Sequence, residues 1–311
     1  MKKTAFFISV LLALCALFAF VGCGEISSGG ENLDAGEQTQ YAPQDTEQYI
    51  SHEWQLYEEA KEIDGYTGTF MDFLKDIGFT ATDDTAAIHY ALTSAVCVES
   101  TFGTGTGSPG SRGAGVIYSL DTTQGDAYII TNYHVIYGKN QLGQYGVASK
   151  INVYLYGGYV SSRAISATFY GGEMDRDIAV LAVKNAEVFK ETENNPVYAR
   201  AAKIGTSGVV AAGDKIYAIG NPNGDGLSVT AGVVSVPYQG ITVLRADDAK
   251  NIVLPAIKIN AAVNHGNSGG GLFNADGKLI GIVNARSENE ASVGFAIPSV
   301  AFMKVIRGLG L

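Results

Sequence analysis

A serine flanked by glycines is the residue of this chain best suited to nucleophilic chemistry. Ser268 lies in the sequence NHGNSGGGL at 264–272, where the glycines let the backbone approach other groups closely. A serine hydroxyl is a poor nucleophile until a neighbouring base takes its proton, so its meaning depends on a histidine and a carboxylate elsewhere. His134 lies at the end of a β-branched strand pattern, and Asp177 directly precedes the apolar run at 178–181. The chain order His, Asp, Ser is one of three known for the acyl-transfer triad.

Each of these residues also has a simpler structural interpretation. A glycine-rich loop with a serine is more often a plain turn, and an isolated histidine is more often a satisfied core residue. The carboxylate has a specific competitor, because Asp175 is only two residues from Asp177 and would share its strand face. We favour Asp177, because the apolar run follows it directly.

Several fragments, taken in order, resemble the trypsin-like serine proteases of the HtrA/Deg type. The resemblance covers roughly residues 94 to 305. It is carried by the sequences GAGVI, TNYHV, DRDIAVL, AIGNPNG, NHGNSGGGL and VGFAIPS, at 113–117, 131–135, 175–181, 218–224, 264–272 and 293–299. A lone GNSGG would be moderate support, whereas six fragments in the right order are strong support.

The resemblance implies an all-β, chymotrypsin-like fold of two six-stranded β-barrels, with the catalytic residues at their junction and a linker near 184–200. Ser268 would attack the scissile carbonyl, His134 would act as base and then acid, and Asp177 would orient the imidazole. The family geometry assigns the oxyanion hole to the backbone N–H groups of Gly266 and Ser268. We expect no PDZ domain after the protease, although HtrA/Deg proteins commonly carry one.

The hydrophobic pattern independently predicts a β-rich domain over 94–311. From residue 95 onward, short runs of β-branched and aromatic residues alternate with Gly, Asn, Asp and Ser. Helical spacing before it, including a segment at 82–92, predicts a helical spacer over 49–93, and a helical pattern at 298–307 closes the chain. The fold class is therefore all-β with a short helical N-terminal extension.

The first residues predict export. A basic start followed by the apolar stretch 5–21 is typical of a signal peptide, here 1–22, and FVGC at 20–23 resembles a bacterial lipobox with Cys23 as the lipidated residue. An uncleaved anchor helix is the alternative. Residues 23–48 are polar and Gly-rich, which predicts a flexible tether. Removal of the signal and lipidation of Cys23 would leave Cys97 alone, and its apolar surroundings predict a buried thiol.

The charge and the remaining motifs exclude several function classes. The net charge is −10, and loss of Lys2 and Lys3 with the signal would take it to −12, which disfavours nucleic acid and anionic membrane surfaces as partners. The sequence NPNGDG at 221–226 lacks the spacing of a calcium loop and predicts a surface turn. Four histidines without paired spacing indicate no zinc site. We expect neither a metal nor a cofactor.

These observations favour a lipid-anchored serine endopeptidase of the bacterial cell envelope that cleaves exported or surface polypeptides. Ala262, six residues before Ser268, stands where trypsins selective for basic residues carry Asp, so cleavage after small or aliphatic residues is expected. A catalytically silent binding module on the same scaffold is the alternative.

Overall fold

The computed structural model describes residues 83–156, 163–192, 197, 199–286 and 293–311, together with 60–62, 65 and 67. The predicted signal peptide, Cys23, the tether and most of the helical spacer lie outside the described residues. No helix in the part of the chain that the structure describes is long and apolar enough to cross a membrane.

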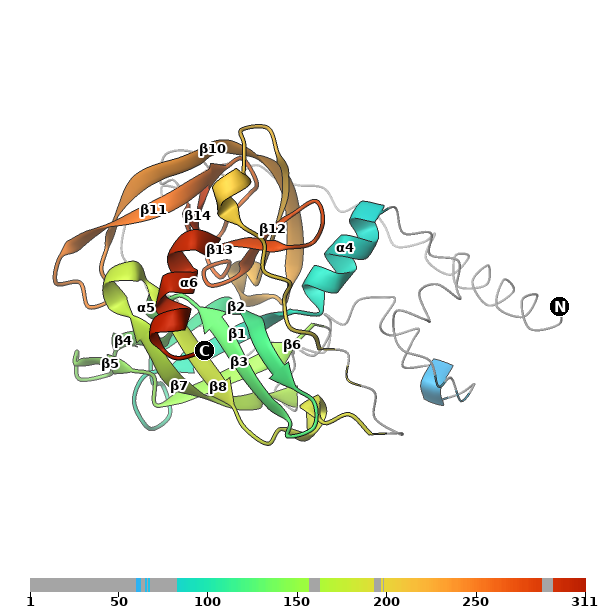
Figure 1. Cartoon of the computed structure of the whole chain (residues 1–311). Helices are drawn as coiled ribbons and strands as arrows, with labels where there is room; N and C mark the ends of the chain where they lie inside the picture. Colours follow the sequence, from blue (N-terminus) through green and yellow to red (C-terminus); the bar gives the residue numbers. More distant parts are fainter. Residues whose placement is uncertain are drawn as a thin grey trace, which may run out of the picture.

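The first half of the domain is a closed antiparallel barrel with strand order β1-β2-β3-β8-β7-β6 (Figure 1). Alternating side chains fill its interior, among them Val96, Val98, Ile129 and Leu181. The strands are β1 Ala95–Thr101, β2 Gly110–Asp121, β3 Asp126–Thr131, β6 Lys150–Leu155, β7 Ile165–Glu173 and β8 Ile178–Val183. A two-stranded hairpin, β4 Tyr137–Lys139 and β5 Tyr145–Val147, projects from it.

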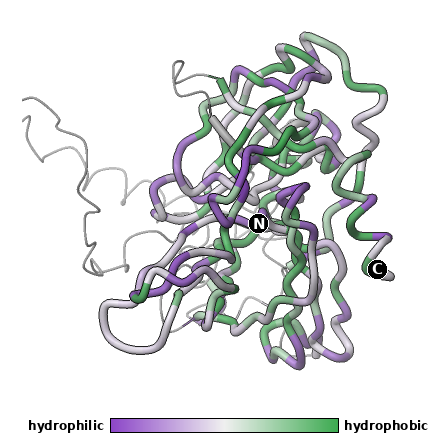
Figure 2. The backbone as a smooth tube through the Cα atoms, turned by 90° about the vertical axis from the view of Figure 1, so that its left-hand side faces the viewer, coloured by the Kyte–Doolittle hydropathy of each residue, from purple (hydrophilic) through white to green (hydrophobic). Residues whose placement is uncertain are grey.

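The second half is another closed barrel, with strand order β10-β11-β14-β13-β12-β9. Its interior cluster includes Ile216, Ile257, Leu272 and Val283. The strands are β9 Lys215–Gly220, β10 Ser228–Leu244, β11 Asn251–Ile259, β12 Gly271–Asn274, β13 Leu279–Arg286 and β14 Gly294–Pro298. The predicted chymotrypsin-like double barrel is confirmed. Hydrophobic and hydrophilic segments alternate along the chain in both halves, as this architecture requires (Figure 2).

A third apolar cluster joins the two barrels. Strand β8 shows why: all six of its residues are buried, with Ala179, Leu181 and Val183 facing the first barrel's interior and Ile178 and Val180 facing the junction. This explains the unbroken apolar run after Asp177, because a strand covered on both faces has no polar side. Residues of both barrels and of helix α6 (Ser299–Gly308) complete the junction cluster, including Val116, Ile219, Ile282, Phe302 and Ile306.

Helix α4 (Asp83–Leu92) packs against this same cluster and emerges beside β12 (Figure 1). Ala91 and Leu92 are buried. A Cβ added to Gly277, in the β12–β13 turn, would lie 2.6 Å from the Ala87 carbonyl oxygen, so helix and turn are in close contact. The described end of the predicted spacer is therefore packed on the barrels.

The fold brings the ends of strands from both barrels to one junction. Residue Thr131 ends β3, Ile178 begins β8, and Gly271 begins β12. The short helix α5 (Tyr133–Ile136) and the 3-10 turn η3 (Met174–Arg176) lie at the first two of these ends. The three sequence motifs with candidate chemistry occupy these positions.

Candidate active site

His134 lies on a single helical turn that the first barrel holds rigidly. Its neighbours Val135 and Ile136 are buried in the barrel core and fix the orientation of α5. The His134 side chain remains 37% exposed, so its ring can be reached from solvent. The sequence therefore places a partly accessible imidazole on a well-anchored backbone.

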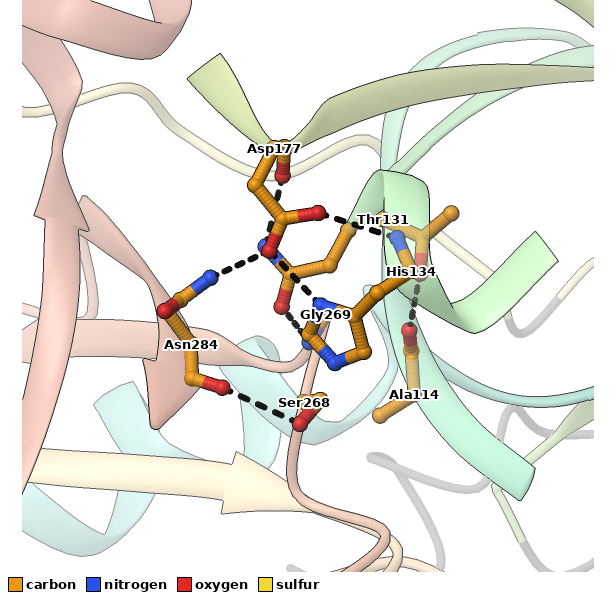
Figure 3. Close-up of polar contacts among 8 residues, drawn as sticks. Ala114, Thr131, His134, Asp177, Ser268, Gly269 and Asn284 are labelled. Carbon is orange, nitrogen blue, oxygen red and sulfur yellow. Dashed lines mark hydrogen bonds and ion pairs between the residues drawn. The ribbon is translucent and has the colours of Figure 1, made fainter. Parts of the chain in front are cut away.

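Asp177 contacts His134 at two points. One carboxylate oxygen, Oδ2, lies 2.6 Å from the imidazole Nδ1, and the other, Oδ1, accepts from the His134 backbone N–H at 2.9 Å (Figure 3). Asp177 has left-handed backbone angles (φ 50°, ψ 41°) and ends η3, with its N–H donated to the Met174 carbonyl. Asp tolerates this conformation better than most residues do. The Asp177 side chain is only 7% exposed, so its carboxylate contacts the ring from a nearly buried position at the junction of the barrels.

The surroundings of His134 act on its pKa in opposite directions. Burial alone would lower the pKa, because it disfavours the charged imidazolium. The negative charge of Asp177 and its hydrogen bond outweigh this effect, and the pKa of His134 lies above its usual value. The pair therefore stabilises a protonated imidazole.

Ser268 reaches the same place from the second barrel. The imidazole of His134 lies between Asp177 and Ser268 (Figure 3). The Ser268 hydroxyl donates to the Asn284 carbonyl at 3.1 Å, and the Ser268 carbonyl accepts from the Ala114 N–H of the first barrel at 2.8 Å. The structure thus brings together all three residues that the sequence singled out.

The backbone N–H groups of Gly266 and Ser268 are the candidate donors for an oxyanion. Among the residues that the structure describes, no protein acceptor bonds the N–H of Gly266 or of Ser268. The His265 carbonyl accepts from the Asn223 N–H at 2.7 Å. Because C=O and N–H point in opposite directions across a trans peptide, this bond turns the Gly266 N–H away from Asn223. Gly266 has φ +94°, and a Cβ there would lie 2.0 Å from the Asn221 carbonyl oxygen, so only glycine fits.

The turn at 221–226 supports this loop. The prediction of a plain surface turn is wrong for Asn221, which is fully buried. Its amide donates to the Gly113 carbonyl at 3.3 Å and accepts from the Gly226 N–H at 2.7 Å. The 3-10 turn η6 (Pro222–Gly224) then presents the Asn223 N–H to His265. The sequence of this segment, rich in Gly and Asn, did not predict that the Asn221 amide would be buried and would link the two barrels.

Two further asparagines, Asn132 and Asn284, hold the site together, although neither belongs to the candidate residues predicted from the sequence. Asn132 is fully buried; its amide donates to the Asp177 carbonyl at 2.9 Å and accepts from the Gly269 N–H at 2.7 Å. The Asn284 amide donates to Asp177 Oδ2 at 2.5 Å. Asn132 directly follows the apolar strand β3, and Asn284 lies within β13 after the apolar residues 279–283. A polar residue beside an apolar run is the one weak sequence signal for such positions, since buried polar groups need partners.

Close approach of the barrels at Gly269 depends on the missing side chain. A Cβ on Gly269 would lie 2.2 Å from both the Ala114 carbonyl oxygen and Thr131 Oγ1. These two atoms are themselves hydrogen bonded at 2.7 Å (Figure 3). The glycine after Ser268 therefore lets the serine loop lie directly against β2 and β3.

Asp175, the competing carboxylate, lies apart from the imidazole contacts. Its side chain is 52% exposed and pairs with Arg245 at 3.0 Å and Lys250 at 3.2 Å. Hydrogen bonds from Arg245 and Lys250 lower the pKa of the Asp175 carboxyl. The geometry supports Asp177 as the partner of His134.

Cys97 and the residue types that bind metals form no second candidate site among the described residues. Cys97 is fully buried, as predicted, and burial strongly raises the pKa of its thiol, which keeps it protonated. Among the residues that the structure describes, no cluster of three or more His, Cys, Asp or Glu side chains could hold a metal ion.

Comparison with known proteins agrees with this arrangement. The family model of the trypsin-like peptidase domain matches residues 113–282. The chain is 33% identical to the serine protease Do-like HtrA of Lactococcus lactis subsp. cremoris over 208 residues, and 35% identical to the periplasmic serine endoprotease DegP of Escherichia coli over 190 residues. These matches cover 64% and 60% of this chain but only 45% and 33% of the relatives, so the chain spans less than half the length of either.

Solved structures show the same fold. The HtrA-type protease AlgW with a tripeptide is 30% identical, with a TM-score of 0.53 over 73% of this chain and 63% of that chain. The active form of the Rv3671c protease from M. tuberculosis has a TM-score of 0.56 over 72% of this chain and 84% of that chain; at 19% identity it supports the fold alone. With the family model matching more than half of its length, the chain belongs to the trypsin-like peptidase family, and its domain is similar to those of HtrA-type proteases.

Proposed function

We propose that this chain is a serine endopeptidase in which Ser268 is the nucleophile and His134 is the general base and acid. Asp177 would orient the imidazole and stabilise its protonated form. The observation that carries the proposal is the position of the His134 ring, with Nδ1 2.6 Å from Asp177 Oδ2 and its other side towards Ser268. Family membership supports it, since the matched relatives are named as serine proteases.

The first step of the reaction is a rotation of the Ser268 hydroxyl, which changes its hydrogen-bond acceptor. Ser268 donates to the Asn284 carbonyl in this structure, so its proton must turn to His134 before the oxygen attacks the scissile carbonyl. His134 takes the proton, and the adjacent Asp177 carboxylate stabilises the imidazolium. The proton then passes to the leaving amine, and water hydrolyses the acyl-enzyme by the same steps in reverse order.

The oxyanion of the tetrahedral intermediate would be bound by the N–H groups of Gly266 and Ser268. Both donors lack a protein acceptor among the described residues. The Asn223–His265 bond supports the proposal, because it holds the Gly266 N–H in one direction before substrate binds. Preorganised donors of this kind are worth roughly 3 kcal/mol of barrier each.

The substrates we propose are exported or surface polypeptides, cleaved after small or aliphatic residues. Ala262 carries no carboxylate to pair with Lys or Arg. The chain would act outside the cytoplasm, held to the membrane by a lipid on Cys23, a proposal that rests on the sequence and on a relative named as periplasmic.

Replacement of the nucleophile tests the activity itself. Ser268→Ala should abolish labelling by a fluorophosphonate probe and lower kcat on casein by on the order of 10⁶-fold. The exposed β10 residue Ser235 provides a matched control, and Ser235→Ala should label like wild type. Absence of labelling in the wild-type protein would contradict the proposal and favour the silent binding module.

Titration of His134 by NMR tests the assignment of the carboxylate. Asp177→Asn should lower the pKa of His134, because the charge that raises it is lost, and should lower kcat by about 10⁴-fold. Since the base must be neutral, kcat/KM falls as pH drops through this pKa, so the acid limb of the profile should move to lower pH.

The matched control is Asp175→Asn, which should move this pKa much less, because Asp175 contacts Arg245 and Lys250 instead of the ring. A larger effect at Asp175 than at Asp177 would reverse the assignment.

A peptide library tests the specificity. With Ala262 in place of an acidic residue, cleavage should follow Ala, Val or Leu at the position before the scissile bond. A strong preference for Arg at that position would refute the proposed pocket chemistry.

Fractionation of cells tests the anchor. The chain with Cys23 should be found with the membrane, and Cys23→Ser should be released or retained only as the unprocessed precursor. Equal membrane attachment of both proteins in processed form would contradict lipidation at Cys23.

A further inference from the structure

The turn between β10 and β11 carries an ion-pair cluster that no step of the proposed chemistry uses. It spans Arg245–Lys250 and belongs to the second barrel. The turn is closed by its own backbone, with the Arg245 N–H donated to the Lys250 carbonyl at 2.9 Å and the Asp248 N–H to the Arg245 carbonyl at 2.8 Å. Asp248 adopts φ +55°, which completes the reversal.

Within the turn, Asp247 fixes the guanidinium of Arg245. The Arg245 Nε lies 2.8 Å from Asp247 Oδ1 and Nη2 lies 2.6 Å from Oδ2, a bidentate pair. The Asp247 Oδ1 atom also accepts from the Ala249 N–H at 3.1 Å, so the carboxylate is itself tied to the backbone. Because the guanidinium is planar, two bonds through Nε and Nη2 also fix the direction of the third nitrogen, Nη1.

That remaining nitrogen reaches the first barrel. Arg245 Nη1 donates to Asp175 Oδ1 at 3.0 Å, and the Lys250 ammonium lies 3.2 Å from the same atom. Asp175 lies on η3, the 3-10 turn that Asp177 caps in a left-handed conformation. The contact across the barrels therefore acts on the turn that presents the carboxylate to His134.

A second contact from the same turn reaches the segment after His134. The Asp248 carboxylate accepts from the Tyr145 hydroxyl and lies 3.4 Å from the Lys139 ammonium. Both partners belong to the β4–β5 hairpin, which follows α5 directly along the chain. The β10–β11 hairpin extends beside this side of the first barrel (Figure 1).

We infer that Arg245–Lys250 is a clasp between the barrels, and that Arg245 is a positioning residue that holds the Asp177 segment against His134 by way of Asp175. The inference rests on the proposed function. The pairs are exposed, with Asp175 52% and Arg245 22% accessible, so each alone contributes little. Their combined effect arises because one closed turn contacts both η3, which precedes Asp177, and the β4–β5 hairpin, which follows His134.

The test compares Arg245→Gln with Arg176→Gln in the full chain. The Arg176–Glu173 pair, at 2.8 Å, is also exposed and also on η3, but it stays within the first barrel. Arg245→Gln should lower kcat about fivefold with KM nearly unchanged, and should move the acid limb of the kcat/KM profile to lower pH. Arg176→Gln should leave kcat and the pH profile near those of the wild type. Arg245→Lys, which keeps the positive charge, should lower kcat less than Arg245→Gln does.

A double-variant cycle identifies the partner. Asp175→Asn should reproduce the Arg245→Gln effect, and the two together should not exceed either alone. Equal kcat and equal pH profiles for Arg245→Gln and Arg176→Gln would overturn the clasp, as would a fall in melting temperature without any shift of the profile.

The His134 pKa measured by NMR separates this inference from the proposed function. It needs no turnover, so a protein that fails to cleave peptides still reports on the clasp. Arg245→Gln should move the His134 pKa in the same direction as Asp177→Asn does, by a smaller amount. An unchanged pKa would contradict the clasp even in an active enzyme.

Discussion

The buried amide of Asn132 is the constraint on which the candidate site depends. It lies on the His134 segment, donates to the Asp177 carbonyl and accepts from the Gly269 N–H, so one side chain joins the His, Asp and Ser segments. A buried amide left without partners is unfavourable by about 1–3 kcal/mol, which makes any arrangement that separates these segments costly. The relative position of the barrels is thereby coupled to the geometry of the three catalytic candidates.

Around this amide, contacts are graded from buried to exposed. The inner bonds, among them Asn284 to Asp177 and Ala114 to Ser268, are shielded from water and so set distances tightly. The clasp at Arg245–Lys250 is exposed and screened by salt. The buried bonds define the relative positions of His134, Asp177 and Ser268. The Arg245–Lys250 turn further restricts the movement of the segments that carry His134 and Asp177.

Much of the fold followed from the sequence because strands, turns and the fully apolar β8 have local patterns. The apolar run after Asp177 belongs to the pattern that predicted a β-rich domain, and the structure shows a strand there with both faces covered. The residues His134, Asp177 and Ser268 could be named because their flanking motifs are specific, and the structure brings them together.

The supporting polar residues could not be predicted in the same way. Asn132, Asn221 and Asn284 acquire their roles only when segments 45 to 137 positions apart meet. No local period marks such a residue, and Asn221 in particular lies in a sequence typical of a surface turn. The pairing of Arg245 with Asp175 is similarly non-local, since it depends on how far the β10–β11 hairpin extends.

The central claim is that Ser268 from one barrel is activated by His134 from the other, beside donors already in place. A crystal structure of the protein after reaction with a peptidyl phosphonate tests it most directly. We expect a covalent bond from phosphorus to Ser268 Oγ, with His134 Nε2 within hydrogen-bond distance of the adduct and the phosphonyl oxygen bound by the N–H groups of Gly266 and Ser268. An adduct on another residue, or a phosphonyl oxygen turned to solvent with the His265 carbonyl in its place, would contradict it.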